Sequence, residues 1–196
     1  MKKPKTNDSK RIFQIKVTLR DTRPPIWRRL LVRDTVPLGQ FHDLLQVVMG
    51  WTDSHAHQFM KGAEYYGPKE LEMPEVRDES RVRLKEVLQK PKDRLLYEYD
   101  FGDGWLHDVV LERVDESEPK GKYPWVLAGK RACPPEDCGG IPGYYELLQV
   151  LKNPRHPNRK ETLEWLGEPF DPGDFDAYER NTRFHGGWYR ARPPGA

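Results

Sequence analysis

The sequence predicts an α+β fold in which a β-grasp-like mixed sheet surrounds one helix, with C-terminal helices packed on the same core. Residues 12–114 contain several segments in which apolar and polar residues alternate, which is the period of half-buried strands. At Leu38 this period changes to that of an amphipathic helix, so two strands precede a helix and further strands follow it. Residues 142–184 carry helical patterns separated by Gly and Pro.

Length and composition favour a single domain. The 196 residues suit one domain, which we expect over residues 12–184, with a disordered basic tail over 1–11 and a flexible tail over 185–196. No apolar run approaches the roughly 18 residues that a membrane span needs. The first residues also lack the apolar segment of a signal peptide. We therefore expect a cytoplasmic protein without a membrane partner.

Positive charge gathers at the start of the chain. Residues 1–33 hold eleven Lys or Arg residues and two Asp residues, although the whole chain carries a net charge of only +2. A basic arm can steer a protein toward nucleic acid, with Arg28 and Arg29 as candidate contacts; the alternative is a solvated tail and the exposed face of a strand. No zinc-finger spacing or heptad repeat accompanies it. Any nucleic-acid binding is expected to be weak, non-specific and salt-dependent.

The pattern of residues 12–114 predicts strands around one helix. We expect strands over residues 13–19, 26–32, 95–101 and 105–113, a short strand through His57 and Phe59, and helices over 38–49 and 84–88. Gly50 is the expected stop of the longer helix. Residues 68–81 are charged, contain two prolines and show no period, so they are expected to form a loop.

The segment Asp100–Asp108 joins the last two of these strands. Gly102 and Gly104 allow the positive φ angles of a three-residue hairpin loop, which would place Phe101 opposite Trp105 and Tyr99 opposite His107. One interpretation is a tight turn between core strands, with a satisfied core histidine. The other is one edge of a polar pocket.

The helical part begins after an irregular loop. Residues 133–140 contain two Cys, two acidic residues, two Pro and two Gly, without any period. A helix is expected to start at Pro142, and a second runs from about Asn158 to Leu166. A third is expected to follow Pro172, with Phe175 and Tyr178 on its apolar side.

Several of these segments together resemble the plasmid pRiA4b ORF-3-like family. The matching segments lie at residues 24–29, 38–43, 49–51, 55–59, 100–107, 133–140 and 170–172. Together they span about residues 12–182. The family usually has Leu at the position of Ala56, and its second cysteine varies. The resemblance implies a protein found on plasmids, on mobile elements and widely in bacterial and archaeal genomes, without a settled activity.

Two kinds of metal site are candidates. Cys133 and Cys138 could share a zinc ion with histidines drawn from His55, His57 or His107, although only half of a zinc-finger ligand set is present. Alternatively, carboxylates could hold magnesium, manganese or calcium together with His107 or His57. This second interpretation uses Asp100, Asp103, Glu136 and Asp137. The cofactor is otherwise unknown, and ordinary turns are the simpler explanation of such carboxylates.

Three functions are compatible with the sequence. A non-catalytic binding or accessory module for protein or nucleic acid leads, because no complete catalytic set can be assembled. A metal-assisted hydrolase that uses the His/Asp/Glu cluster is the alternative, and a purely structural protein comes third. No nucleophile elbow or phosphate-binding loop is present. The candidate pocket comprises His55, His57, Asp100, Asp103, Trp105, His107, Glu136 and Asp137.

Overall fold

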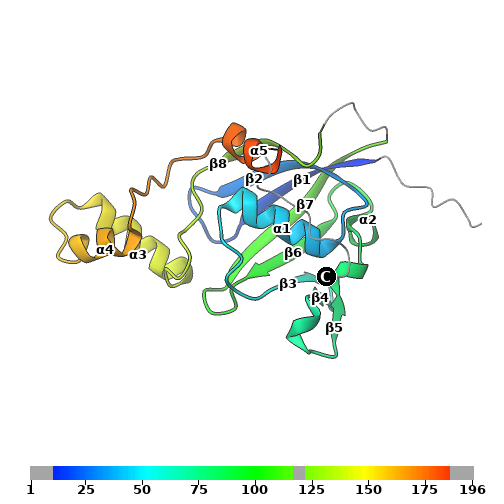
Figure 1. Cartoon of the computed structure of the whole chain (residues 1–196), viewed down its shortest axis with the longest axis horizontal. Helices are drawn as coiled ribbons and strands as arrows, with labels where there is room; N and C mark the ends of the chain where they lie inside the picture. The colour runs from blue at the N-terminus through cyan, green and yellow to red at the C-terminus, as the bar shows by residue number, and fades with distance from the viewer. Residues whose placement is uncertain (1–10, 117–121, 186–196) are drawn as a thin grey trace, which may run out of the picture.

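The computed structural model describes residues 11–116 and 122–185, and its main element is an eight-stranded sheet with the order β5-β4-β3-β6-β7-β1-β2-β8 (Figure 1). The tails predicted over 1–11 and 185–196 lie outside the described residues, apart from Arg11 and His185. The strands are β1 (Ile12–Leu19), β2 (Ile26–Arg33), β3 (His57–Lys61), β4 (Glu64–Gly67), β5 (Val76–Asp78), β6 (Arg94–Tyr99), β7 (Trp105–Asp115) and β8 (Trp125–Lys130). The helices are α1 (Leu38–Met49), α2 (Leu84–Val87), α3 (Gly140–Lys152), α4 (Arg159–Leu166) and α5 (Ala177–His185).

The strand pairing confirms an α+β fold. The predicted strands near 13–19, 26–32, 95–101 and 105–113 are all present, as is the helix over 38–49. Neighbouring strands are antiparallel except β4 and β5, which are parallel. The β-grasp-like arrangement is not confirmed, because the sheet is larger and β1 pairs antiparallel with both of its neighbours.

Helix α1 packs on one face of the sheet and closes the core (Figure 1). Leu38, Phe41, Leu45 and Val48 are fully buried, as their helical spacing predicts. Gly50 ends the helix with a left-handed φ of 98°, and its N–H donates to the carbonyl of Gln46. The inward side chains of the strands meet this apolar face, so the core lies between the sheet and α1.

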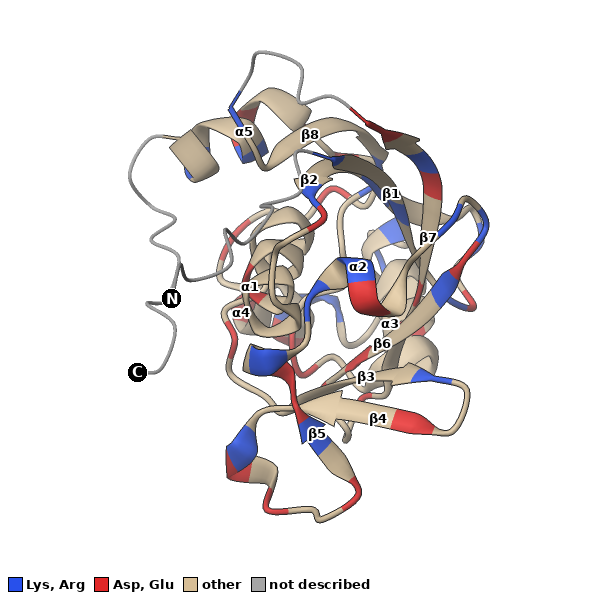
Figure 2. Cartoon of the chain, turned by 90° about the vertical axis from the view of Figure 1, so that its right-hand side faces the viewer, with Lys and Arg blue, Asp and Glu red and all other residues tan. Residues whose placement is uncertain are grey.

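The opposite face of the sheet carries paired charges. Arg20 forms an ion pair with Asp108 at 2.8 Å. Arg29 pairs with Glu112 in the same way, at 2.6 Å. Figure 2 shows acidic and basic residues interspersed along β1 and β7. The basic character of the N-terminal strands is therefore partly neutralised by acidic residues that arrive much later in the chain.

Three strands, β4, β5 and β8, were not predicted. Residues 68–81, expected to form a loop, contain β5 together with the 3₁₀ turns η1 (Lys69–Leu71) and η2 (Glu79–Arg81). Strand β8 pairs with β2 at the other edge of the sheet. β5 and β8 are the edge strands of the sheet, and none of the three shows a clear alternation of apolar residues, so the sequence offered no period to recognise.

The C-terminal helices differ in how much they bury. Helix α3 buries Tyr144, Leu147 and Val150, whereas α4 has no buried residue. In α5, Asn181 extends the edge of β8, because its side chain accepts from Val126 N at 2.8 Å and donates to Val126 O at 3.0 Å. Tyr178 is exposed, so its predicted place on an apolar side is wrong. One domain over 12–184 stays a prediction.

The helices within residues 11–116 and 122–185 are short or carry charged residues. None of them combines the length and the apolar character required to cross a bilayer.

Candidate functional site

The hairpin between β6 and β7 has a longer loop than predicted. Tyr99 faces Trp105 and Tyr97 faces His107, so five residues, Asp100 to Gly104, form the loop. The expected register, with Tyr99 opposite His107, is wrong. Asp100 adopts a left-handed φ of 58°, and its carboxylate accepts from the N–H groups of Gly102 and Asp103. These hydrogen bonds stabilise the left-handed backbone of Asp100, a residue other than glycine, at the start of the turn. The residue types alone do not show that the turn begins at Asp100.

The loop 133–140 meets the tip of this hairpin. Gly139 N donates to Asp103 Oδ2 at 3.2 Å. Gly140 has a φ of 65°, and a Cβ atom built on it would lie 2.5 Å from the carbonyl oxygen of Asp103. The close approach therefore requires glycine at this position. The candidate pocket takes residues from both of these loops, and this contact brings the two loops together.

We expect Gly140→Ala to destabilise the protein by about 2 kcal/mol, because the new Cβ would collide with the Asp103 carbonyl in addition to the cost of a left-handed φ. Gly104→Ala is the matched control, since Gly104 has a φ of 67° but open space around its Cβ position. The control is expected to cost only about 1 kcal/mol. Urea unfolding of both variants measures the difference. Equal losses would show that the contact between the loops adds no constraint.

Glu136 links the loop 133–140 by hydrogen bonds to the segment that follows α1 and to Tyr99. Its carboxylate accepts hydrogen bonds from the Tyr99 hydroxyl and from the hydroxyl and backbone N–H of Thr52. Nearby, Trp51 Nε1 donates to the carbonyl of Pro134 at 3.0 Å. Burial and the bond to Glu136 raise the pKa of Tyr99, so its hydroxyl stays a donor at neutral pH. Glu136 thus has a clear positioning role.

His55, Asp100 and Asp137 form a cluster on the surface beside Glu136. His55 Nε2 lies 3.1 Å from Asp137 Oδ1 and 3.7 Å from Asp100 Oδ2. One ligand atom from each of the three residues lies within 4.8 Å of the others, which is close enough for a shared cation. Three of the predicted pocket residues are therefore brought together.

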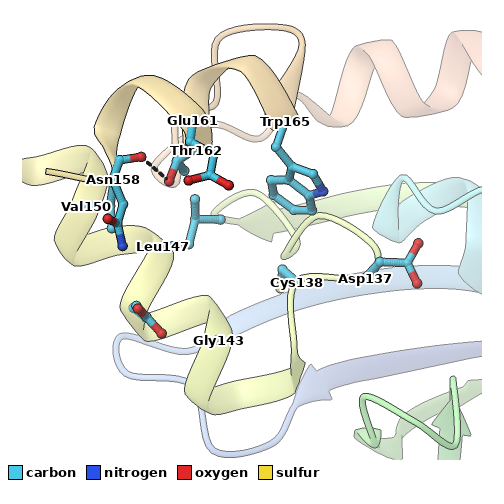
Figure 3. A pocket seen from close by; sticks show the side chains of 10 residues that line it. Asp137, Cys138, Gly143, Leu147, Val150, Asn158, Glu161, Thr162 and Trp165 are labelled. Carbon is cyan, nitrogen blue, oxygen red and sulfur yellow. Dashed lines mark hydrogen bonds between the residues drawn. The ribbon is translucent and has the colours of Figure 1, made fainter.

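A cavity of about 370 Å³ opens beside this cluster, between α3 and α4 (Figure 3). Leu147 and Trp165 project into it from the two helices, and Glu161 lies next to Trp165 (Figure 3). Asp137 and Cys138 stand at its edge. The lining residues are Asp137, Cys138, Gly143, Glu146, Leu147, Val150, Asn158, Glu161, Thr162 and Trp165. Of these, only Asp137 was predicted as a pocket residue, and Cys138 as a metal ligand.

His107 and Trp105 lie in the core rather than at this surface. Both are fully buried, and the His107 ring meets the ring of Trp51 edge to face at a centroid distance of 5.4 Å. His107 Nδ1 lies 3.3 Å from the carbonyl of Tyr97. Burial lowers the pKa of His107 to about 4, so the ring is neutral at pH 7. His107 is a core histidine, the simpler of the two interpretations of the hairpin.

The two cysteines are free thiols, Cys133 buried and Cys138 partly buried. Within the described residues, neither joins His107 or any other histidine in a cluster of three ligand atoms. Burial raises the pKa of each thiol to about 12, which disfavours the thiolate that zinc requires. The predicted zinc set of Cys133, Cys138 and His107 is therefore not assembled.

His57 belongs to a second group that the sequence did not reveal. Its ring stacks on the ring of His42 from α1, and Asp53 lies beside His42. The three residues are close in the chain but lie on α1, on the segment after it and at the start of β3, and no single periodic pattern spans these elements, so residue types alone gave no signal for the group.

The two adjacent arginines of β2 have different surroundings. Arg28 is fully buried, whereas Arg29 is partly exposed and paired with Glu112. A phosphate at the surface cannot reach Arg28 in this arrangement. The apolar residues Ile26, Leu30 and Val32 share its side of the strand, and this alternation could have shown that Arg28 points inward.

Three comparisons relate the chain to known proteins. The sequence model of the family described as plasmid pRiA4b ORF-3-like protein matches residues 11–179. The uncharacterized protein y4hQ of Sinorhizobium fredii (strain NBRC 101917 / NGR234) is 37% identical over 172 residues, which cover 87% of this chain and 86% of that protein. The crystal structure of a protein of unknown function, MM3350 from Methanosarcina mazei Go1, matches with a TM-score of 0.79 and 34% identity, over 86% of this chain and 97% of that one.

Proposed function

The chain belongs to the plasmid pRiA4b ORF-3-like family, as its motifs predict, and from this premise we propose that it is a non-catalytic binding module for protein. The proposed binding site is the cavity between α3 and α4. Neither relative compared above carries a named activity, so the proposal rests on the chemistry of the cavity itself.

One observation supports this proposal above the others: the cavity combines an exposed aromatic wall with carboxylates. Trp165 is 50% exposed although it lines the cavity, and Leu147 forms the opposite wall. Glu146 and Glu161 supply negative charge, and none of the described lining residues is basic, whereas the Asp137 carboxylate points away from the cavity (Figure 3) and pairs with His55. A lysine or arginine side chain of a partner fits this chemistry, because its aliphatic stem can cover Trp165 while its charge meets a carboxylate.

We expect a lysine-rich hexapeptide to bind the protein and Trp165→Ala to weaken this binding about fivefold, the loss expected for a cation held on an indole ring. Leu163→Ala is the matched control, since Leu163 is 41% exposed on the same helix but does not line the cavity. Titration calorimetry gives both affinities. Equal affinities for the two variants, or equal binding of a glutamate-rich hexapeptide, would contradict the proposal.

A metal-assisted hydrolase is the second candidate, favoured by the cluster of His55, Asp100 and Asp137 next to the cavity. Two carboxylates and one imidazole suit manganese or magnesium. Against it, one oxygen of Asp100 already holds two N–H groups of the hairpin loop. Manganese-dependent hydrolysis of a chromogenic phosphodiester that is lost in His55→Gln would favour the hydrolase.

We also propose where the protein is found and which partner it favours. We infer a cytoplasmic location, which the two free thiols support because reducing compartments keep cysteines unpaired. The β-grasp-like relationship between the sheet and α1, and an association with mobile elements, rest on the order of the elements and on the family resemblance. Nucleic acid is a weaker candidate partner than protein, because Arg28 is buried and Arg29 is paired with Glu112.

A further inference from the structure

The ring nitrogen Nε2 of His55 forms no hydrogen bond, although two carboxylate oxygens lie beside it. Asp137 Oδ1 is 3.1 Å away and Asp100 Oδ2 is 3.7 Å away. At 3.1 Å a hydrogen bond would form if the oxygen lay in line with the ring nitrogen, so the Asp137 oxygen lies to the side of that direction. The nitrogen is closed off from solvent, so bulk water cannot be its partner.

Neither protonation state of His55 Nε2 satisfies this arrangement. A protonated Nε2 would point its N–H past the nearest oxygen, whereas an unprotonated one would hold its lone pair beside two negatively charged carboxylates. A cation in line with the lone pair removes both problems, because the nitrogen and the two carboxylates then become its ligands. The arrangement is therefore more favourable with a bound cation than without one.

The spacing of these three atoms also suits ligands around one ion. Ligand atoms about 2.1 Å from an ion, at angles of about 90–110° to one another, lie roughly 3.0–3.5 Å apart. The two distances from His55 Nε2, 3.1 and 3.7 Å, are close to this spacing, and all three atoms lie within 4.8 Å of one another. In such a site each oxygen lies to the side of the nitrogen lone pair, because the ion itself occupies that direction.

Asp100 has one carboxylate oxygen left for an ion. Its Oδ1 accepts from the N–H groups of Gly102 and Asp103. Its Oδ2 accepts no hydrogen bond from residues 11–116 or 122–185 and faces His55, although the side chain is only 10% exposed. A carboxylate oxygen buried to this extent without a donor is costly, so it is a strong candidate for a bond to a cation.

No basic side chain neutralises the acidic residues at this junction of two loops. Across the described ranges, Asp100, Asp103, Glu136 and Asp137 form no ion pair with a Lys or Arg residue. On the outer face of the sheet, by contrast, acidic residues are paired with arginines. The junction therefore has an excess of negative charge that attracts a cation.

We propose that His55, Asp100 and Asp137 bind one divalent manganese ion, which joins the segment after α1 to the hairpin loop and to the loop before α3. Two carboxylates, one imidazole and water suit manganese, and Asp137, whose side chain is 70% exposed, leaves the remaining positions open to water. The hydrolase described above would require this ion, but the ion requires no hydrolase. The site is equally independent of protein binding in the cavity.

The test is manganese binding to the full chain after treatment with EDTA, followed by the EPR signal of the free ion. We expect one ion per chain, and an unfolding temperature that rises with manganese concentration, because only the folded chain assembles the site. Asp100→Asn and Asp137→Asn should each weaken binding by at least the roughly 10–100-fold that loss of an outer partner costs. Asn tolerates the φ angles of 58° and 57° at these positions, and its amide oxygen can still accept from the two N–H groups at position 100.

Asp103→Asn is the matched control. Asp103 lies in the same hairpin loop and loses the same charge, but its carboxylate accepts from Gly139 N and does not belong to the cluster. Its replacement should weaken manganese binding less than about threefold at physiological salt, because salt screens a charge that does not touch the ion.

Pulsed EPR should detect one imidazole nitrogen bound to manganese, and His55→Gln should remove that signal. The absence of manganese binding, a count of no nitrogen or of two, or a nitrogen signal that persists in His55→Gln would each overturn the proposal, even if an Asn variant failed to fold. A loss in Asp103→Asn as large as the loss in Asp100→Asn would overturn it as well.

Discussion

Replacing Arg28 by methionine is expected to lower the free energy of unfolding by about 4 kcal/mol, since each buried acceptor left without a donor costs about 1–3 kcal/mol. The Arg28 side chain donates to the backbone carbonyls of Trp27, Val48 and Lys130. Its guanidinium also lies over the ring of Phe175, 4.1 Å from the centroid. It therefore ties β2 to the end of α1, to β8 and to the segment before α5.

A smaller effect opposes this loss. Burial lowers the pKa of Arg28 to about 10, so the buried group still carries its charge at pH 7, and methionine would remove the cost of keeping that charge out of water. We expect the three lost hydrogen bonds and the lost ring contact to outweigh this gain, because methionine cannot satisfy any of the three carbonyls.

Arg29→Met is the control for this prediction. Arg29 is the next residue of the same strand, but it points to the other face and forms a partly exposed ion pair with Glu112. Exposed pairs contribute about 0.2–1 kcal/mol, so its replacement should change stability by no more than this. Urea unfolding of both variants gives the comparison. Similar losses would show that Arg28 does not hold the surrounding elements together.

The second large effect is a dependence of stability on pH caused by His107. Burial lowers its pKa to about 4 in the folded protein, below the ordinary value of 6.5. Between these two values the unfolded chain binds a proton that the folded protein does not bind, so stability falls as pH falls through this range. The loss should reach about 3 kcal/mol once the pH is below about 4, at 1.36 kcal/mol for each pH unit of difference.

His107→Gln should flatten this dependence although it lowers stability at pH 7. Val109→Ala, on the same side of β7 and equally buried, is the matched control: it should lower stability at every pH and keep the slope. His42, whose pKa burial also lowers, leaves a weaker dependence of the same sign in both variants. Urea unfolding between pH 7.5 and pH 4.5 distinguishes them. An unchanged slope in His107→Gln would contradict the prediction.

The candidate site was predictable only in part. The candidate pocket predicted from the sequence combines residues of the hairpin 100–108 and of the loop 133–140. In the structure these two segments are in contact, through Asp103 and Gly139. The predicted pocket also contains His107, Trp105, His55 and His57. The structure instead buries the first two in the core, leaves His55 at the surface and pairs His57 with His42. Alternation shows which side of a strand a residue occupies, but not which distant residue meets it there.

The sequence by itself determined the local elements and the family. The alternation along β1, β2, β6 and β7 and the helical spacing of α1 depend on neighbouring residues only, so they can be read without the fold. Only the tertiary structure decided which polar groups meet. The stacking of His42 on His57 joins α1 to β3, and the bond of Arg28 to the carbonyl of Lys130 joins β2 to β8 across 102 positions of the chain. Strand pairing and helix packing set these contacts, and no local pattern carries that information.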